Sequence, residues 1–338
     1  MASKKNDIIE IGDGWACSLN MSDTNPSIVC FYLGKQVADL PISSIIACVP
    51  CYHSTGEKPK TAANTPFSMV QVPEPKSLIK VASTLNSAIL KTTRLTNTCI
   101  VSAEADTDAP SLVIAVGGNS RHHFEDEELG RMIATTEASQ NMACTGATPV
   151  AFLKLPLLSN FSAQPLLGLL GLLPHTTPRI NLAFKGKGEM IYLLGRSVED
   201  VASSEYLFHI HHIHPSPAPY VNPQEQSRLQ TALCEAINKN LLSSIHSITR
   251  GGIFTSLIES SIPNHLGFDI TTDVEIREDA FLFGEALGRF IVSTSEKSDI
   301  PFVDLMTHLK IPITTLGHTT KGEIRIDDIS YGFIRDFD

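Results

Sequence analysis

The chain has 338 residues, of which 42% are hydrophobic and 18% are charged. This composition is that of an ordinary globular protein, and the length suggests two domains. The net charge of −10, without a Lys/Arg stripe, argues against nucleic acid and anionic membranes as partners. The first residues lack the apolar stretch of a signal peptide, and the most apolar segment, 165–174, is too short to cross a bilayer. We therefore expect a cytoplasmic protein with no membrane partner.

Residues 8–45 alternate short apolar runs with turn signals, which predicts a few short strands. Cys48 and Cys51 follow as a C-x-x-C pair. No second ligand pair accompanies them, and the odd total of seven cysteines favours reduced, structural thiols over a disulfide framework. Residues 52–75 are polar and rich in Pro, which indicates a linker or an extended arm.

From Pro75 the pattern predicts a helix, a strand in "TNTCIVSAE", a strand in "SLVIAVGGN" and then a long helix. That helix begins in the acidic run 125–128, whose charges suit a helix N-terminus, and ends at Gly146. The strand "TPVAFLKLPL" and the Leu-rich piece 165–174 follow.

The second half alternates strands and helices, which predicts an α/β or α+β domain. Its clearest element is a helix in "NPQEQSRLQTALCEAINKNLLSS". Asn222 is expected to cap this helix, Pro223 to occupy its first turn and Glu225 to close a capping box. Leu residues and an Ile then repeat every four positions.

"HIHHIH", residues 209–214, contains four histidines. On a strand, successive side chains alternate between faces, so three ligands from one strand converge poorly on a metal. We therefore interpret the segment as a partly exposed strand end rather than as a zinc site.

Gly251 and Gly252 stand between a Ser/His/Thr/Arg cluster and an apolar run at helical spacing. Glycines that open a helix often let backbone N–H groups approach an anion. A tight turn that needs positive φ produces the same pattern. The residues alone leave both interpretations open.

Several separated stretches resemble one family. They are "SSEYL", "NPQEQSRLQTALCEAI", "SSIHSITRGGIFTSLIES" and "LFGEALGRFIVS" in the second half, and "GRMIATTEASQNMACTGATPVAF" and "PLLGLLGLLP" in the first. Their order and wording resemble phosphoribosylformylglycinamidine synthase, the ATP-dependent amidoligase of purine biosynthesis in the aminoimidazole ribonucleotide synthase superfamily. The resemblance covers roughly residues 60–330 and is to the second half of that enzyme.

The resemblance implies a two-domain α+β or α/β fold of the aminoimidazole ribonucleotide synthase type. We expect N-terminal strands and an arm in 1–60, a shortened first domain in 61–175 and an α/β domain in 176–338. In the family, first-domain sheets pair into a closed barrel, and the stretches at 98–104, 111–116 and 166–173 look too apolar for an open face. A homodimer, or pairing with a synthase-like first half, is therefore expected, with a glutaminase as a further possible subunit.

The resemblance also implies the site. ATP or ADP with Mg²⁺ is the expected cofactor, and the Gly pair lies beside the phosphate cleft, which favours the anion interpretation. His246 is the expected catalytic residue, and Glu137 and Glu285 the expected metal ligands. The expected nucleotide and phosphate contacts are Asn119, Asn141, Glu205, Gly251, Gly252 and Arg289.

The chain departs from the family pattern at three places. Gly117 and Gly118 stand where the family has a magnesium-binding acid at a strand end, and Ser247 replaces an Asp. The segment between "TPVAFLKLP" and "PLLGLLGLLP" is too short for the usual substrate loop. Because magnesium requires oxygen ligands such as carboxylates, an alternative is a catalytically silent scaffold for an active half. We expect the isolated chain not to catalyse amidine formation or ATP hydrolysis.

Overall fold

The structure, a computed structural model, divides into two compact units. One unit comprises Met1–Gly56 and Thr93–Thr177, and the other Glu57–Thr92 and Pro178–Asp338. The residues described within them are 8–22, 25–45, 72–89, 98–104, 106–118, 127–155, 167–201, 204–213 and 219–337.

The N-terminal sheet of the first unit confirms the short strands predicted in residues 8–45. Four antiparallel strands lie in the order β1-β2-β3-β4 and are followed by the short helix α1. Their bounds are β1 (Ile8–Gly12), β2 (Trp15–Asn20), β3 (Ser27–Tyr32), β4 (Lys35–Pro41) and α1 (Ile42–Ile45).

A second antiparallel sheet in this unit has the order β5-β6-β8-β7, with helix α4 connecting β6 to β7 in sequence. Its Leu-rich strand β8 is the 165–174 piece of the sequence. The bounds are β5 (Thr98–Val101), β6 (Ser111–Gly117), α4 (Glu127–Ala143), β7 (Thr148–Lys154) and β8 (Leu167–Leu173).

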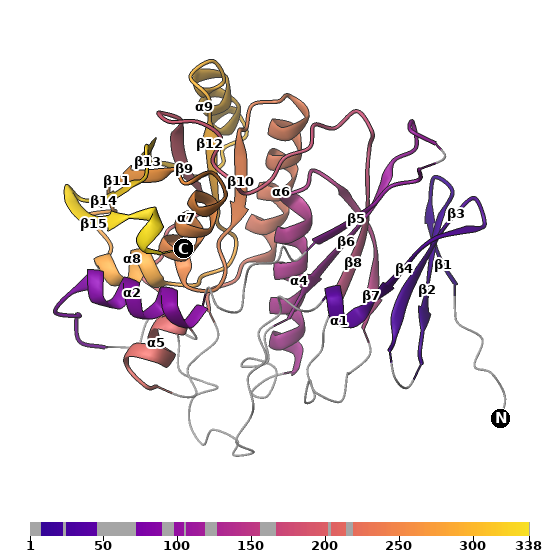
Figure 1. Cartoon of the computed structure of the whole chain (residues 1–338), viewed down its shortest axis with the longest axis horizontal. Helices are drawn as coiled ribbons and strands as arrows, with labels where there is room; N and C mark the ends of the chain where they lie inside the picture. Colours follow the sequence, from indigo (N-terminus) through magenta and orange to yellow (C-terminus); the bar gives the residue numbers. More distant parts are fainter. Residues whose placement is uncertain are drawn as a thin grey trace. The chain divides into compact units, whose positions relative to one another are not determined.

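Both faces of the central strands of this second sheet are covered within the unit, as the alternation of β6 shows. Val113 and Ala115 pack in one cluster with Ala138 and Met142 of α4. Leu112, Ile114 and Val116 belong to a different cluster, which they share with the β1–β4 sheet. Figure 1 shows α4 on one side of the sheet and β1–β4 on the other. The apolarity of β6 and β8, part of our reason for expecting a sheet-to-sheet dimer, is therefore accounted for inside one chain, whereas Ile100 on β5 and Val150 and Phe152 on β7 are exposed.

The second unit is built on one seven-stranded mixed sheet of order β10-β12-β9-β13-β11-β14-β15, in which only β11 and β14 pair in parallel. The bounds are β9 (Met190–Leu194), β10 (Ser244–Ser247), β11 (Gly267–Ile270), β12 (Phe290–Thr294), β13 (Ile313–Thr320), β14 (Glu323–Ile326) and β15 (Ile329–Phe333).

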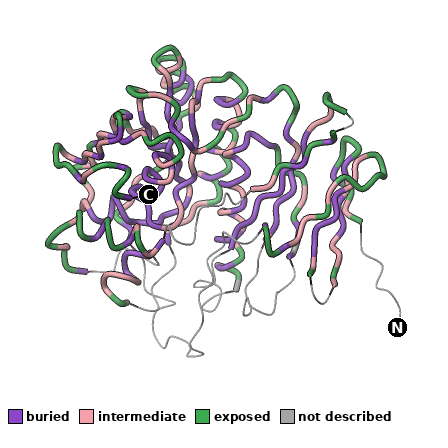
Figure 2. The backbone as a smooth tube through the Cα atoms, in the orientation of Figure 1, coloured by how far each residue is buried: buried purple, intermediate pink, exposed green. Residues whose placement is uncertain are grey.

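Helices pack around this sheet, and four of them, α2, α5, α7 and α8, contribute to one large apolar cluster with its strands. Helix α6 instead packs against α9. Figure 2 shows buried backbone through the sheets and exposed residues at the turns. The helix bounds are α2 (Leu78–Ile89), α5 (Glu205–Ile210), α6 (Pro223–Asn238), α7 (Gly252–Ser261), α8 (Glu278–Phe283) and α9 (Asp299–His308), with short 3-10 turns η2 (Ile262–Asn264) and η3 (Ile334–Asp336).

Helix α2 belongs to the second unit, although it lies in sequence between the two segments of the first unit. We expected residues 61–175 to form one domain, yet residues 57–92 belong to the second unit. The reason lies in the apolar face of α2, because Val81, Leu85 and Ile89 pack in the same cluster as Phe254. In turn, residues 1–56, expected as a separate segment, join the first unit.

Helix α6 starts as the sequence predicted, with one difference. The Asn222 side chain accepts hydrogen bonds from the backbone N–H groups of Gln224 and Glu225, and Pro223 stands in the first turn. The Glu225 carboxylate, expected to close a capping box, accepts a hydrogen bond from the Tyr220 hydroxyl at 3.3 Å. No helix in the described part of the chain combines the length and apolarity needed to cross a membrane.

Candidate functional site

In the first unit, two predicted site residues on α4 contact the end of strand β6. Glu137 Oε2 accepts a hydrogen bond from the backbone N–H of Gly118 at 2.9 Å. Asn141 Nδ2 donates to the carbonyl of Val116 at 3.0 Å and is itself buried. Both side chains, expected to bind metal and nucleotide, therefore have a contact that fixes the strand end.

The strand end itself has no room for the acid that the family pattern expects. A Cβ atom added to Gly117 would lie 2.1 Å from the carbonyl oxygen of Ala134 and 2.5 Å from the nitrogen of Ala138. Both are backbone atoms of α4, so they cannot rotate away. Any side chain at this position requires α4 to move. Asn119, the next predicted contact, lies outside the described residues, as do Cys48 and Cys51.

In the second unit, the Gly pair opens helix α7 with backbone angles that favour glycine. The φ angles of Gly251 and Gly252 are 74° and 69°. The Gly251 N–H donates to Glu285 Oε1 at 2.7 Å, and the Gly252 N–H donates to the Thr249 carbonyl at 3.2 Å. Both interpretations of the glycines therefore hold in part. The turn needs positive φ, and the anion that its Gly251 N–H binds is a carboxylate of the same chain.

Glu285 joins two helix N-termini. Its Oε1 also accepts the backbone N–H of Glu205, the first residue of α5, at 2.7 Å. The side chain is only 6% exposed, so these charge-assisted bonds form in a protected environment. Glu285, expected to bind a metal, is positioned by two backbone amides instead.

The carboxylate of Glu205 is fully buried and has two basic neighbours. Arg250 Nε donates to its Oε1 at 2.9 Å, and His209 Nε2 lies 3.0 Å from its Oε2. The resemblance gives Glu205 and Arg289 as expected nucleotide contacts. The ion pair forms with Arg250, which the sequence analysis missed. Its position directly before the Gly pair was the available signal.

Arg289 is a buried cation held by carbonyl groups. Its Nε donates to the Ala286 carbonyl at 3.0 Å and its Nη2 to the Gly284 carbonyl at 2.7 Å. Burial lowers its pKa to about 10, while the negative charges of Asp200 and Glu285 act in the opposite direction. With 1% of its surface exposed, Arg289 holds the loop between α8 and β12.

His246, the expected catalytic residue, lies on strand β10 and faces α7. Its Nδ1 is 3.0 Å from the Ser256 carbonyl, which can only accept, so Nδ1 carries a proton in this contact, and pairing of Nε2 with a carboxylate requires the second proton of the imidazolium form. Its Nε2 is 3.2 Å from Glu259 Oε2. Both ring nitrogens therefore have partners within the chain.

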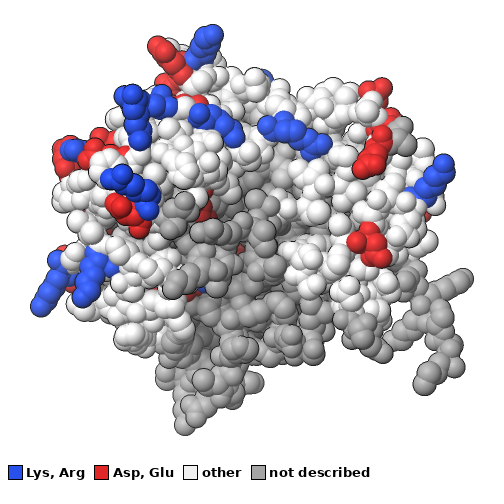
Figure 3. All heavy atoms as spheres, in the orientation of Figure 1, with Lys and Arg blue, Asp and Glu red and all other residues white. Residues whose placement is uncertain are grey.

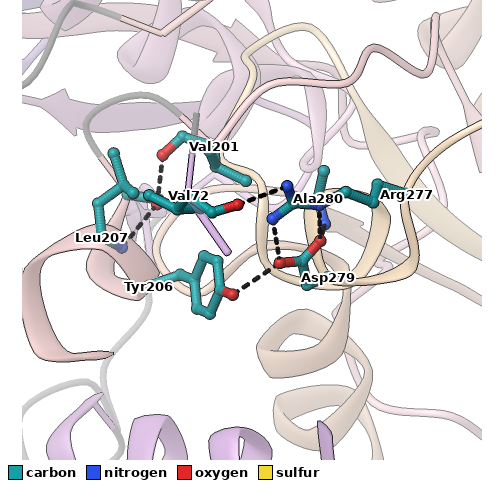
Figure 4. A network of polar contacts seen from close by, with 8 residues as sticks. Val72, Val201, Tyr206, Leu207, Arg277, Asp279 and Ala280 are labelled. Atoms are coloured by element: carbon teal, nitrogen blue, oxygen red, sulfur yellow. Dashed lines mark hydrogen bonds and ion pairs between the residues drawn. The ribbon is translucent and has the colours of Figure 1, made fainter. Parts of the chain in front are cut away.

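A second buried polar network lies beside α5 and α8 (Figure 4). Arg277 donates through Nε and Nη2 to the two carboxylate oxygens of Asp279, at 2.6 and 2.5 Å. Tyr206 donates to Asp279 Oδ2 at 2.6 Å, and Arg277 Nη1 donates to the carbonyl of Val72 at 2.8 Å. Burial tends to raise the pKa of Asp279, but the bonds from Arg277 and Tyr206 outweigh it and lower that pKa. This network ties the segment before α2 to the second unit.

The "HIHHIH" segment is not the strand that we predicted. Residues 205–210 form helix α5, which the Ser204 side chain caps by accepting the Leu207 N–H. His209 is on the helix, and the His211 ring contacts Tyr206 edge to face at 4.8 Å. His214 lies outside the described residues. The cap and the acidic first turn overrode the alternating pattern.

The same residues bear on whether the chain can hold a metal ion. Within the described ranges, no three His, Cys, Asp or Glu side chains group in a way that suits a metal ion. Glu137 and Glu285 each already bind backbone N–H groups, and Gly117 excludes an added carboxylate. The described donor set therefore does not fit a magnesium site.

Figure 3 shows acidic and basic side chains interspersed over one face, without a region of a single sign.

Residues 186–328 match the family model described as AIR synthase related protein, C-terminal domain. The chain is 25% identical to phosphoribosylformylglycinamidine synthase subunit PurL of Petrotoga mobilis, over 89% of this chain and 50% of that protein. With PurL of Thermoanaerobacter pseudethanolicus, it shares 23% identity over 96% of this chain and 53% of the relative. The chain thus spans about half the length of these relatives.

Solved structures show the same fold. Thermotoga maritima PurL complexed with FGAR has a TM-score of 0.60 at 12% identity, covering 78% of this chain and 54% of that one. T. maritima PurL complexed with ATP has a TM-score of 0.54 at 11% identity, over 70% and 45%. The PurLQS structure from the same organism has a TM-score of 0.52 at 15% identity, over 75% and 49%. Residues 186–328 thus match the C-terminal domain of AIR synthase related proteins, and the chain as a whole is similar to one half of phosphoribosylformylglycinamidine synthase.

Proposed function

We propose that this chain is a phosphoribosylformylglycinamidine-synthase-like protein of purine biosynthesis that serves as a non-catalytic half within a larger assembly. Its similarity to PurL over half of that protein's length supports this role. The PurLQS structure, in which a similar protein is part of an assembly, supports partners of the same kind. Pairing with a synthase-like first half, with a glutaminase as a further subunit, is the arrangement that we favour.

The observation that carries the proposal is the close approach at Gly117. The full reaction, ATP-dependent amidation of formylglycinamide ribonucleotide, places a transferring phosphoryl group in a clamp of metal ions and donors. A magnesium ligand at the end of β6 needs a side chain, and the α4 backbone fills that space. Loss of one charged ligand costs about a hundredfold or more in rate.

Adenine nucleotide binding is a separate part of the proposal. The likeness to PurL structures with ATP, ADP and AMPPCP supports it. We assign the contacts to Asn119, Asn141, Glu205, Gly251, Gly252 and Arg289. For a phosphate to reach the Gly251 amide, it has to displace the Glu285 carboxylate. Binding through this turn is therefore expected to be weak.

The test is an assay of the pure chain with ATP, magnesium, formylglycinamide ribonucleotide and ammonia. We expect neither amidine formation nor ATP hydrolysis. A parallel thermal melt with ADP, with and without magnesium, reports binding separately, because a ligand that binds only the folded state raises the melting temperature. Turnover that Glu137→Ala or His246→Ala abolishes would refute the non-catalytic role. An unchanged melting temperature at millimolar ADP would refute nucleotide binding and leave the non-catalytic role untouched.

A further inference from the structure

The two sheets of the first unit share one apolar core. Side chains of the β1–β4 sheet and of α1 pack against one face of the β5-β6-β8-β7 sheet, with few of them exposed to solvent. The members from the N-terminal side are Ile11, Trp15, Cys17, Ile28, Cys30, Ile42 and Ile45, and those from the second sheet include Leu112, Ile114, Val116, Leu153 and Leu170. Such a continuous apolar contact is that of a β-sandwich rather than of two separate sheets.

Hydrogen bonds also join the two sheets at one end of this apolar contact. Trp15 is fully buried, and its Nε1–H donates to the Pro110 carbonyl at 2.8 Å. The Tyr32 ring lies 5.1 Å from the Trp15 ring, and its hydroxyl donates to Asp106 Oδ2 at 2.9 Å. Asp106 and Pro110 both belong to the connection between β5 and β6. The N-terminal sheet is therefore bonded to a defined loop of the second sheet.

On the opposite face, β6 and β8 pack against α4, whereas Val150 and Phe152 on the edge strand β7 are exposed. We propose that the β1–β4 sheet is a built-in partner that closes the face of the β5-β6-β8-β7 sheet opposite α4 to pairing with a second copy of this chain. Any self-association then uses another surface. This inference concerns the first unit only and does not depend on nucleotide binding or catalysis.

Trp15 is the only tryptophan of the chain, so its fluorescence reports this contact directly. The test compares wild type with Ile28→Asp, which places a charge in the shared core, and with Val37→Asp on β4, where the side chain is 40% exposed. We expect blue-shifted Trp15 emission, protected from acrylamide, in wild type and Val37→Asp at every protein concentration. Ile28→Asp should shift the emission to the red, remove the protection and promote association measured by light scattering.

Hydrogen exchange of the wild-type chain covers the case in which Ile28→Asp does not fold. Backbone N–H groups of β2 and β3 should be protected as strongly as those of β6 and β8, because the two sheets open together. Fast exchange in β2 and β3 beside a protected β6 would overturn the proposal. So would solvent-quenched Trp15 in wild type, or an Ile28→Asp variant that behaves like Val37→Asp.

Discussion

The carboxylate of Glu285 accepts the backbone N–H of Gly251 at 2.7 Å, so the anion at the Gly-Gly turn comes from the chain itself. The same oxygen accepts the N–H of Glu205. A buried donor that loses its partner costs about 1–3 kcal/mol. This arrangement makes Glu285 a stabilising residue whose removal affects two helix N-termini together.

Glu285→Ala should therefore lower the free energy of unfolding by about 2–4 kcal/mol, since it leaves two buried N–H groups unsatisfied. Glu285→Gln keeps an acceptor oxygen and should cost less, about 1 kcal/mol. Urea unfolding followed by far-UV circular dichroism measures both, because Trp15 reports only the first unit. Glu275→Ala, on an exposed residue, is the control and should change stability by less than about 0.5 kcal/mol. Equal stability of Glu285→Ala and this control would contradict the stabilising role of Glu285.

Gly252→Ala should destabilise the second unit by about 3 kcal/mol, because it combines positive φ with steric overlap. Its added Cβ would lie 2.7 Å from the carbonyl oxygens of Gly284 and Leu282. Gly188 has a φ of 83° but no atom within 4 Å of the added Cβ. Gly188→Ala should thus show the dihedral cost alone, about 1 kcal/mol. A similar loss for both variants in urea unfolding would mean that the overlap at Gly252 relaxes.

Gly117→Ala tests the close approach of α4 to β6. Gly117 is not at positive φ, so the cost comes from overlap with backbone atoms, and we expect about 2–3 kcal/mol or failure to fold. Gly186→Ala is the matched control, since its added Cβ meets only a side-chain atom at 3.6 Å. Trp15 fluorescence during urea unfolding gives the loss for Gly117→Ala in the first unit, and far-UV circular dichroism gives the loss for Gly186→Ala in the second unit. If Gly117→Asp folds and binds magnesium by calorimetry, α4 yields more readily than the geometry indicates.

The ion pair of Arg277 and Asp279 predicts a pH-dependent contribution to stability. The folded-state pKa of Asp279 is below its unfolded value of about 3.9, so its stabilisation is present above that pH and is lost as the pH falls below it. Asp279→Asn should cost about 2–4 kcal/mol at neutral pH, because it leaves a partly buried guanidinium unpaired. The difference between wild type and variant should shrink as unfolding is measured from pH 6 down to pH 3. A difference that is independent of pH would contradict this account.

Local signals explain what the sequence predicted well. Asn222 and Pro223 start α6 because a side-chain cap and a preset φ act within one turn. The strands of residues 8–41 follow from alternation and turn residues. The resemblance in motifs likewise predicted the fold and the similarity to PurL, which the comparisons confirm.

Long-range partners explain what it did not predict. Glu285 and Gly251 are 34 residues apart, and no local pattern links them. Arg250 pairs with Glu205 because α5 brings that carboxylate to the Gly-Gly turn. The helix at 205–210 could be predicted from local signals, since Ser204 is a capping residue and Glu205 provides an acidic first turn. The roles in catalysis and nucleotide binding of the proposed residues stay predictions.

The discontinuous second unit has a consequence for synthesis on the ribosome. The Asn86 side chain donates to the Phe337 carbonyl at 3.2 Å, across 251 residues of sequence, and the apolar face of α2 packs in the cluster that contains Phe337. A 12-residue helix is marginal in water by itself. At about 5–20 residues per second, α2 waits about 10–50 s before those residues emerge. During that interval its apolar face is open to chaperones and proteases, so the rate of translation downstream of α2 sets how long the nascent chain is vulnerable.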